Sequence, residues 1–336
     1  MKALLFILAL ASLVSCTEQS KMLPNPSGRA GEVLLVMNDV YWEGESGKLL
    51  NSTMTQDVAG LAWSEPIFDI SRLPRAAYND MVRIARNIID VEVGDRYSVA
   101  KVKFFKEQFS RTQAYVKIQA PDEASLYEAI KANEMKLLSF FYMAERDRLM
   151  NYFKQNENDE YKDKVAELIH YDLVIPSMFN HNNFGGDNFV WLSGGSVDAR
   201  TDLALYTIPC DDEKLIDVDY LIAKRDSVMK INVPGPSDGA YMRTADVVPP
   251  TFTKLKMNDV EVYEVRGLWE TTIDFMGGPF ISYAYYDQEA QMIKVLEGFI
   301  YAPHEDKRNL IRRVEAVAYS WKPNATAYPS PKNPVE

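Results

Sequence analysis

Residues 260–301 read VEVYEVRGLWETTIDFMGGPFISYAYYDQEAQMIKVLEGFIY, and this stretch decides the fold of the second half of the chain. Three runs rich in β-branched and aromatic residues, at 260–268, 280–286 and 292–301, predict strands. Polar or glycine-containing turns separate them, as expected for consecutive strands of one antiparallel sheet. A helical segment at roughly 305–320 follows, so we expect helices to cover this sheet.

The region before these strands fits the same architecture. We expect a short helix ending near His170, strands near Leu173, at 188–192 and at 202–208, a helix at roughly 213–230, and a Pro/Gly-rich loop at 234–239. In the first half we expect strands and helices in alternation. The expected strands are 32–37, 66–70, 98–107 and 113–119, and the expected helices are 42–54, 74–89 and 122–153.

The segment 154–164 is dense in charged and amide residues and predicts the boundary between two halves. We therefore expect an α+β protein of mainly antiparallel sheets, each covered by helices. The expected parts are a leader at 1–15, a tether at 16–31, an N-terminal α/β half at 32–157, a C-terminal α+β half at 158–322 and a flexible tail at 323–336. A strand–proline–acid–helix pattern recurs at Pro121, Pro209 and Pro303. It leaves duplication of the halves as the less favoured alternative to simple helix capping.

The N-terminus carries an export signal. Lys2 precedes an apolar or small-residue run from Ala3 to Val14, which is too short to span a bilayer. The end of this run forms the sequence Leu13-Val14-Ser15-Cys16. These four residues resemble the bacterial lipobox, in which the cysteine receives diacylglycerol. We expect cleavage before Cys16, acylation of its sulfur and an N-terminal palmitate-type anchor. Thr17 is not the aspartate that marks inner-membrane retention, which favours the outer membrane, facing the periplasm.

Composition excludes several classes of function. The formal net charge of −11 and the lack of a basic stripe argue against nucleic-acid binding. Only two cysteines are present, so lipidation of Cys16 leaves Cys210 without a disulfide partner. We expect Cys210 to be buried packing.

The residues of common catalytic and metal sites are sparse. His170, His181 and His304 have no metal-ligand spacing, so we expect no metal and no cofactor. The segment 191–196 lacks a serine nucleophile elbow, and the segment 181–188 lacks a calcium-binding register. Only acid pairs such as Asp198 with Asp202, or Asp211 with Asp212, leave an envelope hydrolase as an alternative.

The richest local chemistry lies around Arg266-Gly267-Leu268-Trp269 and Met276-Gly277-Gly278-Pro279-Phe280. The side chains of Trp269, Phe275 and Phe280 could form an apolar wall beside Arg266, which could grip a carboxylate. Such a wall would suit a sugar ring or an aliphatic chain of a partner. The competing interpretation is a hairpin whose aromatic residues belong to the core.

At these residues the chain resembles a Bacteroidetes lipoprotein family known as domain of unknown function 4837. Further landmarks are Gly28-Arg29-Ala30-Gly31-Glu32-Val33-Leu34, Arg86-Asn87-Ile88, Phe189-Val190-Trp191-Leu192, Arg225-Asp226-Ser227, Pro234-Gly235-Pro236 and Glu297-Gly298-Phe299-Ile300-Tyr301-Ala302-Pro303. The resemblance extends over nearly the whole mature chain. It implies an envelope lipoprotein and no particular activity.

These observations favour a non-enzymatic binding or assembly role in the cell envelope. The expected partners are the membrane, through the lipid anchor, and an envelope protein or glycan. An envelope hydrolase and a structural spacer of an envelope complex are the alternatives.

Overall fold

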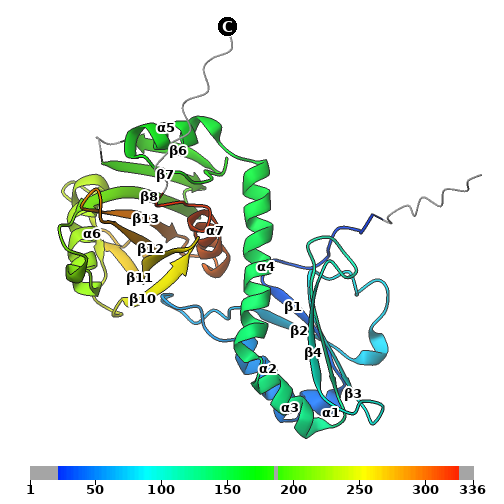
Figure 1. The fold of residues 1–336 in the computed structure, drawn as a ribbon. Helices are drawn as coiled ribbons and strands as arrows, with labels where there is room; N and C mark the ends of the chain where they lie inside the picture. Colours follow the sequence, from blue (N-terminus) through cyan, green and yellow to red (C-terminus); the bar gives the residue numbers. More distant parts are fainter. Residues whose placement is uncertain (1–21, 185–187, 325–336) are drawn as a thin grey trace, which may run out of the picture.

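A computed structural model describes residues 22–184 and 188–324, which form two sheets (Figure 1). The N-terminal domain contains a five-stranded sheet in the order β2-β1-β3-β5-β4. Its strands are β1 (Glu32–Val36), β2 (Asp69–Leu73), β3 (Asn87–Val93), β4 (Lys101–Lys106) and β5 (Ala114–Ala120). β4 runs antiparallel to β5, whereas the other pairs are parallel. The sheet is therefore mixed.

Helices cover one face of this sheet. They are α1 (Asp39–Trp42), α2 (Glu45–Met54), α3 (Glu123–Lys131) and α4 (Glu134–Gln155). A 3-10 turn, Arg75–Ala77, follows β2, and its Arg75 contacts Asp90 on the other face. Leu50, Leu126 and Phe141 of the helices pack with Val33 and Val116 of the strands in one fully buried core. Asp122 caps α3, as the acid after Pro121 predicts, because its carboxylate accepts a hydrogen bond from the Ser125 amide at 2.8 Å.

The C-terminal domain contains an eight-stranded sheet in the order β10-β11-β12-β13-β8-β7-β6, with β9 paired to β11. Every pairing in it is antiparallel. Together the two domains confirm the expected α+β class. The strands are β6 (Phe179–Phe184), β7 (Phe189–Gly195), β8 (Arg200–Pro209), β9 (Met242–Thr244), β10 (Thr251–Met257), β11 (Val260–Thr271), β12 (Gly277–Asp287) and β13 (Met292–Tyr301).

Helices cover both faces of the larger sheet (Figure 1). α5 (Asp159–Ile169) and α7 (Arg308–Ala318) pack on one face, and α6 (Val218–Asn232) packs on the other. α6 is tied to the sheet by a buried ion pair in which the Arg225 guanidinium lies 2.8 Å from the Glu297 carboxylate. A short 3-10 turn, Glu213–Leu215, precedes α6.

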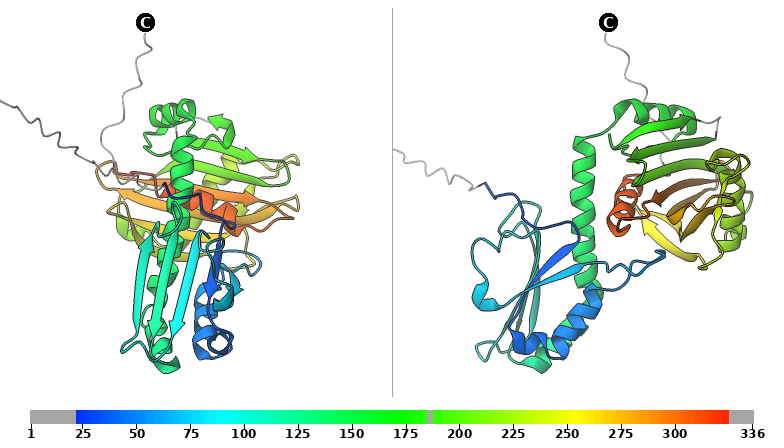
Figure 2. Two further views of the ribbon diagram at one scale, coloured as in Figure 1. Left: turned by 90° about the vertical axis from the view of Figure 1, so that its right-hand side faces the viewer. Right: turned by 180° about the vertical axis from the view of Figure 1, so that it is seen from behind.

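α4 belongs to both domains. Leu137 and Phe141 near its start lie in the N-terminal core, whereas Phe153 near its end lies in the C-terminal core. The helix stands between the two sheets in Figure 1 and in the right-hand view of Figure 2. With 22 residues it extends about 33 Å at 1.5 Å per residue, so one continuous helix bridges the domains.

The structure corrects several expected elements. The helix predicted at 74–89 is a 3-10 turn followed by a loop and by β3, in which Ile88 and Ile89 are buried on opposite faces of the sheet. The helix predicted at 122–153 breaks at Ala132 and Asn133 into α3 and α4. The expected strand near Leu173 is irregular chain, and strands β6, β9 and β10 were not expected.

Cys16 and the predicted signal peptide lie outside the described residues. The predicted tether, residues 16–31, is described from Met22 onward, and this part is held against the N-terminal domain. The Ser27 amide donates to the carbonyl of Ile84, and the Arg111 amide donates to that of Pro24. Within 22–184 and 188–324, no helix combines the length and apolar character needed to cross a bilayer.

Candidate functional site

The predicted binding wall is not a surface. Trp269 and Phe280 are 2% and 1% exposed, and the Arg266 side chain is only 13% exposed. Trp269 packs edge-on against the buried Phe299, and its indole N–H donates to the carbonyl of Ile300 at 3.1 Å. Phe275 alone of the four is fully exposed. The predicted wall is wrong because successive side chains of β11 and β12 point to opposite faces of the sheet, and helices cover both faces.

The glycines of the same stretch make room for these aromatic rings. A Cβ at Gly278 would lie 2.0 Å from the carbonyl oxygen of Ile300 and 3.3 Å from the indole nitrogen of Trp269. A Cβ at Gly267 would lie 2.8 Å from the ring of Phe280. Backbone and rings approach closely here, which only glycine permits. Much of the stretch therefore serves packing.

Arg266 connects the two domains instead of binding a ligand. Its guanidinium contacts Glu264 on the same strand and lies 2.7 Å from Glu315 of α7. Glu315 in turn accepts a hydrogen bond from the hydroxyl of Tyr142 on α4. Burial and the adjacent Glu315 carboxylate raise the pKa of Tyr142, so its hydroxyl remains a donor. The three side chains form one buried polar link between α4, α7 and β11.

The start of α7 is held by the N-terminal domain. The Glu65 carboxylate accepts hydrogen bonds from the amides of Lys307 and Arg308 at 2.8 and 2.7 Å. A helix N-terminus has unpaired amides and favours a negative charge, so a residue more than 240 positions away caps this helix. In addition, the Arg308 guanidinium forms an ion pair with Asp69 of β2, at 2.8 Å. The sequence pattern at Pro303 predicted local acids in this role.

A hollow of about 390 Å³ lies where the segment preceding β2 meets the C-terminal sheet. We name it the interdomain cleft. Its walls come from four segments of chain: the loop before β2, the segment between β9 and β10, the β11–β12 hairpin, and the start of α7. The lining residues include Leu61, Trp63, Val247, Trp269, Met276 and Pro303. Buried Trp269 is its floor rather than an exposed wall.

Exposed apolar side chains gather at the mouth of the interdomain cleft. Trp63 and Val247, which line it, are both 77% exposed. Phe275 and Ile273 lie in the hairpin loop that contributes Met276 to the lining, and both are exposed. Apolar side chains from three loops around one concavity are the usual sign of a binding site. Exposed Asp246 and half-buried Glu270, which pair with Arg243, add acidic groups nearby.

Comparison with known families divides the chain between two of them. Residues 26–156 match the family described as domain of unknown function DUF8532, and residues 158–320 match domain of unknown function DUF4837. The chain carries both domains. The resemblance to DUF4837 was expected over nearly the whole mature chain. It is correct for the second half only, since the landmarks around Gly28 and Arg86 lie in the DUF8532 domain. A comparison with curated proteins gives no match.

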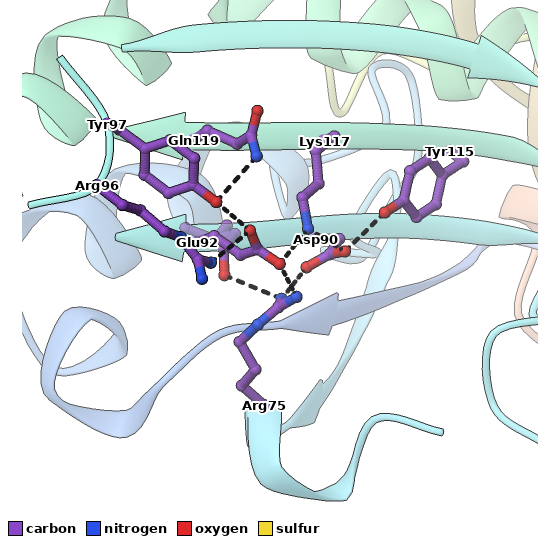
Figure 3. Close-up of polar contacts among 9 residues, drawn as sticks. Arg75, Asp90, Glu92, Arg96, Tyr97, Tyr115, Lys117 and Gln119 are labelled. Atoms are coloured by element: carbon purple, nitrogen blue, oxygen red, sulfur yellow. Dashed lines mark hydrogen bonds and ion pairs between the residues drawn. The ribbon is translucent and has the colours of Figure 1, made fainter. Parts of the chain in front are cut away.

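The DUF8532 domain holds a second polar cluster, on the sheet face opposite its helices (Figure 3). Asp90 and Glu92 of β3 are bridged by the guanidinium of Arg75, and the Lys117 ammonium lies 2.7 and 2.6 Å from them. Tyr97 also donates to Glu92. Partial burial opposes ionisation, but the contacts with Lys117, Tyr97 and Arg75 lower the pKa of Glu92 to about 2. Asp90 and Glu92 each have cationic partners within the cluster. The cluster therefore stabilises the sheet, and its carboxylates are poorly suited to acid catalysis.

The paired carboxylates of the hydrolase alternative do not meet across a cleft. Asp202 is fully buried, whereas Asp198 lies exposed in the β7–β8 turn. Asp211 and Asp212 are exposed, and Asp212 caps the 3-10 turn before α6. Within residues 22–184 and 188–324, no group of three or more His, Cys, Asp or Glu side chains has metal-binding geometry.

The remaining predicted residues have structural places. Cys210 is buried in the core of the DUF4837 domain beneath α6. His170 ends α5 in a left-handed conformation, with φ of 59°. The functional candidates that sequence reasoning missed are Trp63 and Val247. The sequence feature that could have identified them is a large apolar residue in a loop that ends in proline. The two loops are Leu61-Ala62-Trp63-Ser64-Glu65-Pro66 and Asp246-Val247-Val248-Pro249-Pro250.

Proposed function

We propose that the protein is a lipid-anchored component of the bacterial cell envelope that binds a partner polypeptide, without catalysis, at the interdomain cleft. The observation that carries the proposal is that two exposed apolar side chains, Trp63 and Val247, line a hollow between firmly linked domains. Exposed aromatic anchors beside a preformed pocket are the usual energetic centre of a protein interface. Preformed walls lower the entropic cost of binding.

The charge of the protein constrains the partner. The chain has a formal net charge of −11, and near the mouth of the interdomain cleft the carboxylates of Asp246 and Glu270 share one cation, Arg243. An anionic lipid surface would be repelled there. The preferred occupant is a segment with an apolar side chain for the hollow and lysine or arginine residues beside it.

The cellular address rests on the sequence of residues 1–17. The apolar run ending in Leu13-Val14-Ser15-Cys16 supports export and acylation, and Thr17 supports an outer-membrane position facing the periplasm. Replacement of Cys16 by serine tests the anchor directly. We expect labelled palmitate to enter the natural protein and not the Cys16→Ser variant. Equal labelling of the two would refute the anchor without touching the binding proposal.

Site-specific photocrosslinking tests the binding site. A photoreactive phenylalanine at position 247 in the full-length protein should capture a partner, which mass spectrometry identifies together with its crosslinked segment. A synthetic peptide of that segment should then bind the purified wild-type protein. We expect Trp63→Ala to weaken this binding about tenfold or more, as loss of an aromatic anchor does.

The matched control is Ile231→Ala, which removes an equally exposed apolar side chain from α6. It should leave the affinity for the peptide unchanged. Equal affinities of Trp63→Ala and the wild type, or a captured segment without basic residues beside its apolar anchor, would contradict the proposed site.

A further inference from the structure

A second hollow lies at the edge of the DUF4837 sheet and shares no lining residue with the interdomain cleft. It measures about 360 Å³ and is built on β6, the edge strand, on β7 and on the β7–β8 turn. We name it the edge pocket. Its lining includes His181, Asn183, Trp191, Ser193, Ser196 and Arg200. One indole, one imidazole, an amide, two hydroxyls and one guanidinium therefore share a small concavity.

The strand register explains why His181, Asn183, Trp191 and Ser193 face the same side. Val190 and Leu192 are fully buried in the core beneath α5 and α7, so Trp191 and Ser193 point to the opposite face. Trp191 pairs with Asn183 of β6, and Ser193 pairs with His181. The sheet itself thus brings the edge-strand polar side chains beside the indole.

A buried carboxylate orients the two largest groups of the edge pocket. Asp202 is fully buried; its Oδ1 accepts the indole N–H of Trp191 at 2.9 Å, and its Oδ2 accepts the Nε–H of Arg200 at 2.7 Å. The Trp191 ring is also backed by Phe299, with 6.0 Å between ring centroids. Both rotamers are fixed before any ligand arrives, which is the arrangement of a preorganised site.

The pocket has donors to spare but no unmatched charge. Arg200 uses its Nε–H for Asp202, and no other residue in the described part of the chain accepts a hydrogen bond from its terminal nitrogens. Its guanidinium carbon lies over the Trp191 ring, 5.9 Å from the ring centroid, so these donors lie close to the indole. Asp202 balances the positive charge of Arg200. An uncharged ligand with many hydroxyls would fit better than an anion.

We propose that the edge pocket binds a neutral pyranose unit of a glycan, with one sugar face on Trp191 and its hydroxyls on Arg200, Ser193 and Asn183. The C–H face of a pyranose is apolar and suits an aromatic ring, while its hydroxyls need donors and acceptors at the rim. The volume is near the lower limit for ligand pockets, which fits one or two sugar units.

Saturation-transfer NMR and calorimetry with the purified protein test the proposal. The probes are glucose, galactose, mannose, N-acetylglucosamine, a β-linked disaccharide of each, and glucuronate. We expect at least one neutral sugar to bind. Trp191→Ala should weaken it about tenfold or more, and Arg200→Gln should weaken it with fold retained. Circular dichroism confirms folding, and Trp191→Phe should restore part of the affinity.

Trp63→Ala is the matched control because it removes an exposed tryptophan from the interdomain cleft and leaves the edge pocket intact. Sugar affinity should not change in this variant. Absence of saturation transfer to every neutral sugar, binding unaffected by Trp191→Ala, or a tenfold preference for glucuronate over glucose would each overturn the proposal. None of these results bears on peptide binding at the interdomain cleft.

Discussion

The buried link through Arg266 leads to a prediction of domain coupling. Replacing Arg266 by alanine removes the guanidinium from a site where the Arg266 side chain is 13% exposed and its partner Glu315 is 4% exposed. Glu315 would keep only the Tyr142 hydroxyl among the partners described above. Removal of one member of a buried pair leaves an uncompensated charge, which typically costs about 3–5 kcal/mol. We expect a loss of this size in the free energy of unfolding.

Arg243→Ala is the matched control. Arg243 lies on β9, the strand paired with β11, and its ion pair with Glu270 is partly exposed on both sides. Exposed pairs contribute about 0.2–1 kcal/mol, so the two arginine variants should differ by roughly 2 kcal/mol or more. Urea unfolding followed by tryptophan fluorescence measures the difference. Because the link joins α4 to α7, Arg266→Ala should also separate the unfolding transitions of the two domains.

A double variant distinguishes loss of the ion pair from simple loss of packing. Arg266→Met retains an apolar side chain of similar length, and combining it with Glu315→Gln removes the uncompensated charge of Glu315, the more buried of the two carboxylate partners. We expect the double variant to be more stable than the sum of the two single losses indicates, by about 1 kcal/mol or more. Additive losses, or an Arg266→Ala variant within about 1 kcal/mol of Arg243→Ala, would refute the reasoning.

Three further predictions concern the framework. The lowered pKa of Glu92, about 2 against 4.5 for the unconstrained side chain, gives stability that is present above pH 4.5 and lost as the pH falls toward 2. Glu92→Gln should remove about 1–2 kcal/mol of that pH-dependent stability after allowance for solvent screening, and equal acid profiles would contradict it. Gly278→Ala should destabilise the DUF4837 domain by about 1–3 kcal/mol through the clash with Ile300, while Gly94→Ala, which meets no atom within 4 Å, gives the effect of an added methyl group without a clash. Asp122→Ala should cost about 1 kcal/mol by uncapping α3; thermal unfolding unchanged by it would show that the cap is dispensable.

Three strands of the C-terminal sheet were predictable because they are long and joined in chain order. The three runs in 260–301 are rich enough in β-branched and aromatic residues to identify strands, and β11, β12 and β13 are neighbours in the sheet. The loop at 74–86 was missed for a physical reason. Met81, Ile84, Ala85 and Ile88 recur at helical spacing, but Met81 is exposed while Ile88 belongs to a strand buried on both faces. Periodicity alone does not separate these cases.

The candidate site was only half predictable from sequence. The stretch around Arg266 does contribute Trp269, Met276 and Gly278 to the interdomain cleft. Its exposed anchors, however, are Trp63, far away in sequence, and Val247, in a separate loop, and local patterns carry no information on such contacts. Buried charge pairs are equally hidden, because Arg266 and Glu315 are 49 positions apart. An arginine beside aromatic residues therefore has the same appearance in a ligand site and in an interdomain link.

Several landmark residues are polar ties inside the fold. Asn87 donates to Glu145 of α4 at 2.7 Å, Arg225 holds α6 to β13 through Glu297, and Arg266 joins α7 to β11. Each tie fixes a helix to a sheet at a buried position, where an unpaired charge would be costly. Such residues resist substitution for stability alone, so their presence in a motif does not locate a ligand. Trp63, Val247, Trp191 and Arg200 differ from these residues, because they line hollows and keep exposed apolar area or spare donors. We therefore expect binding at side chains that the buried framework holds in place but that make no essential contact within it.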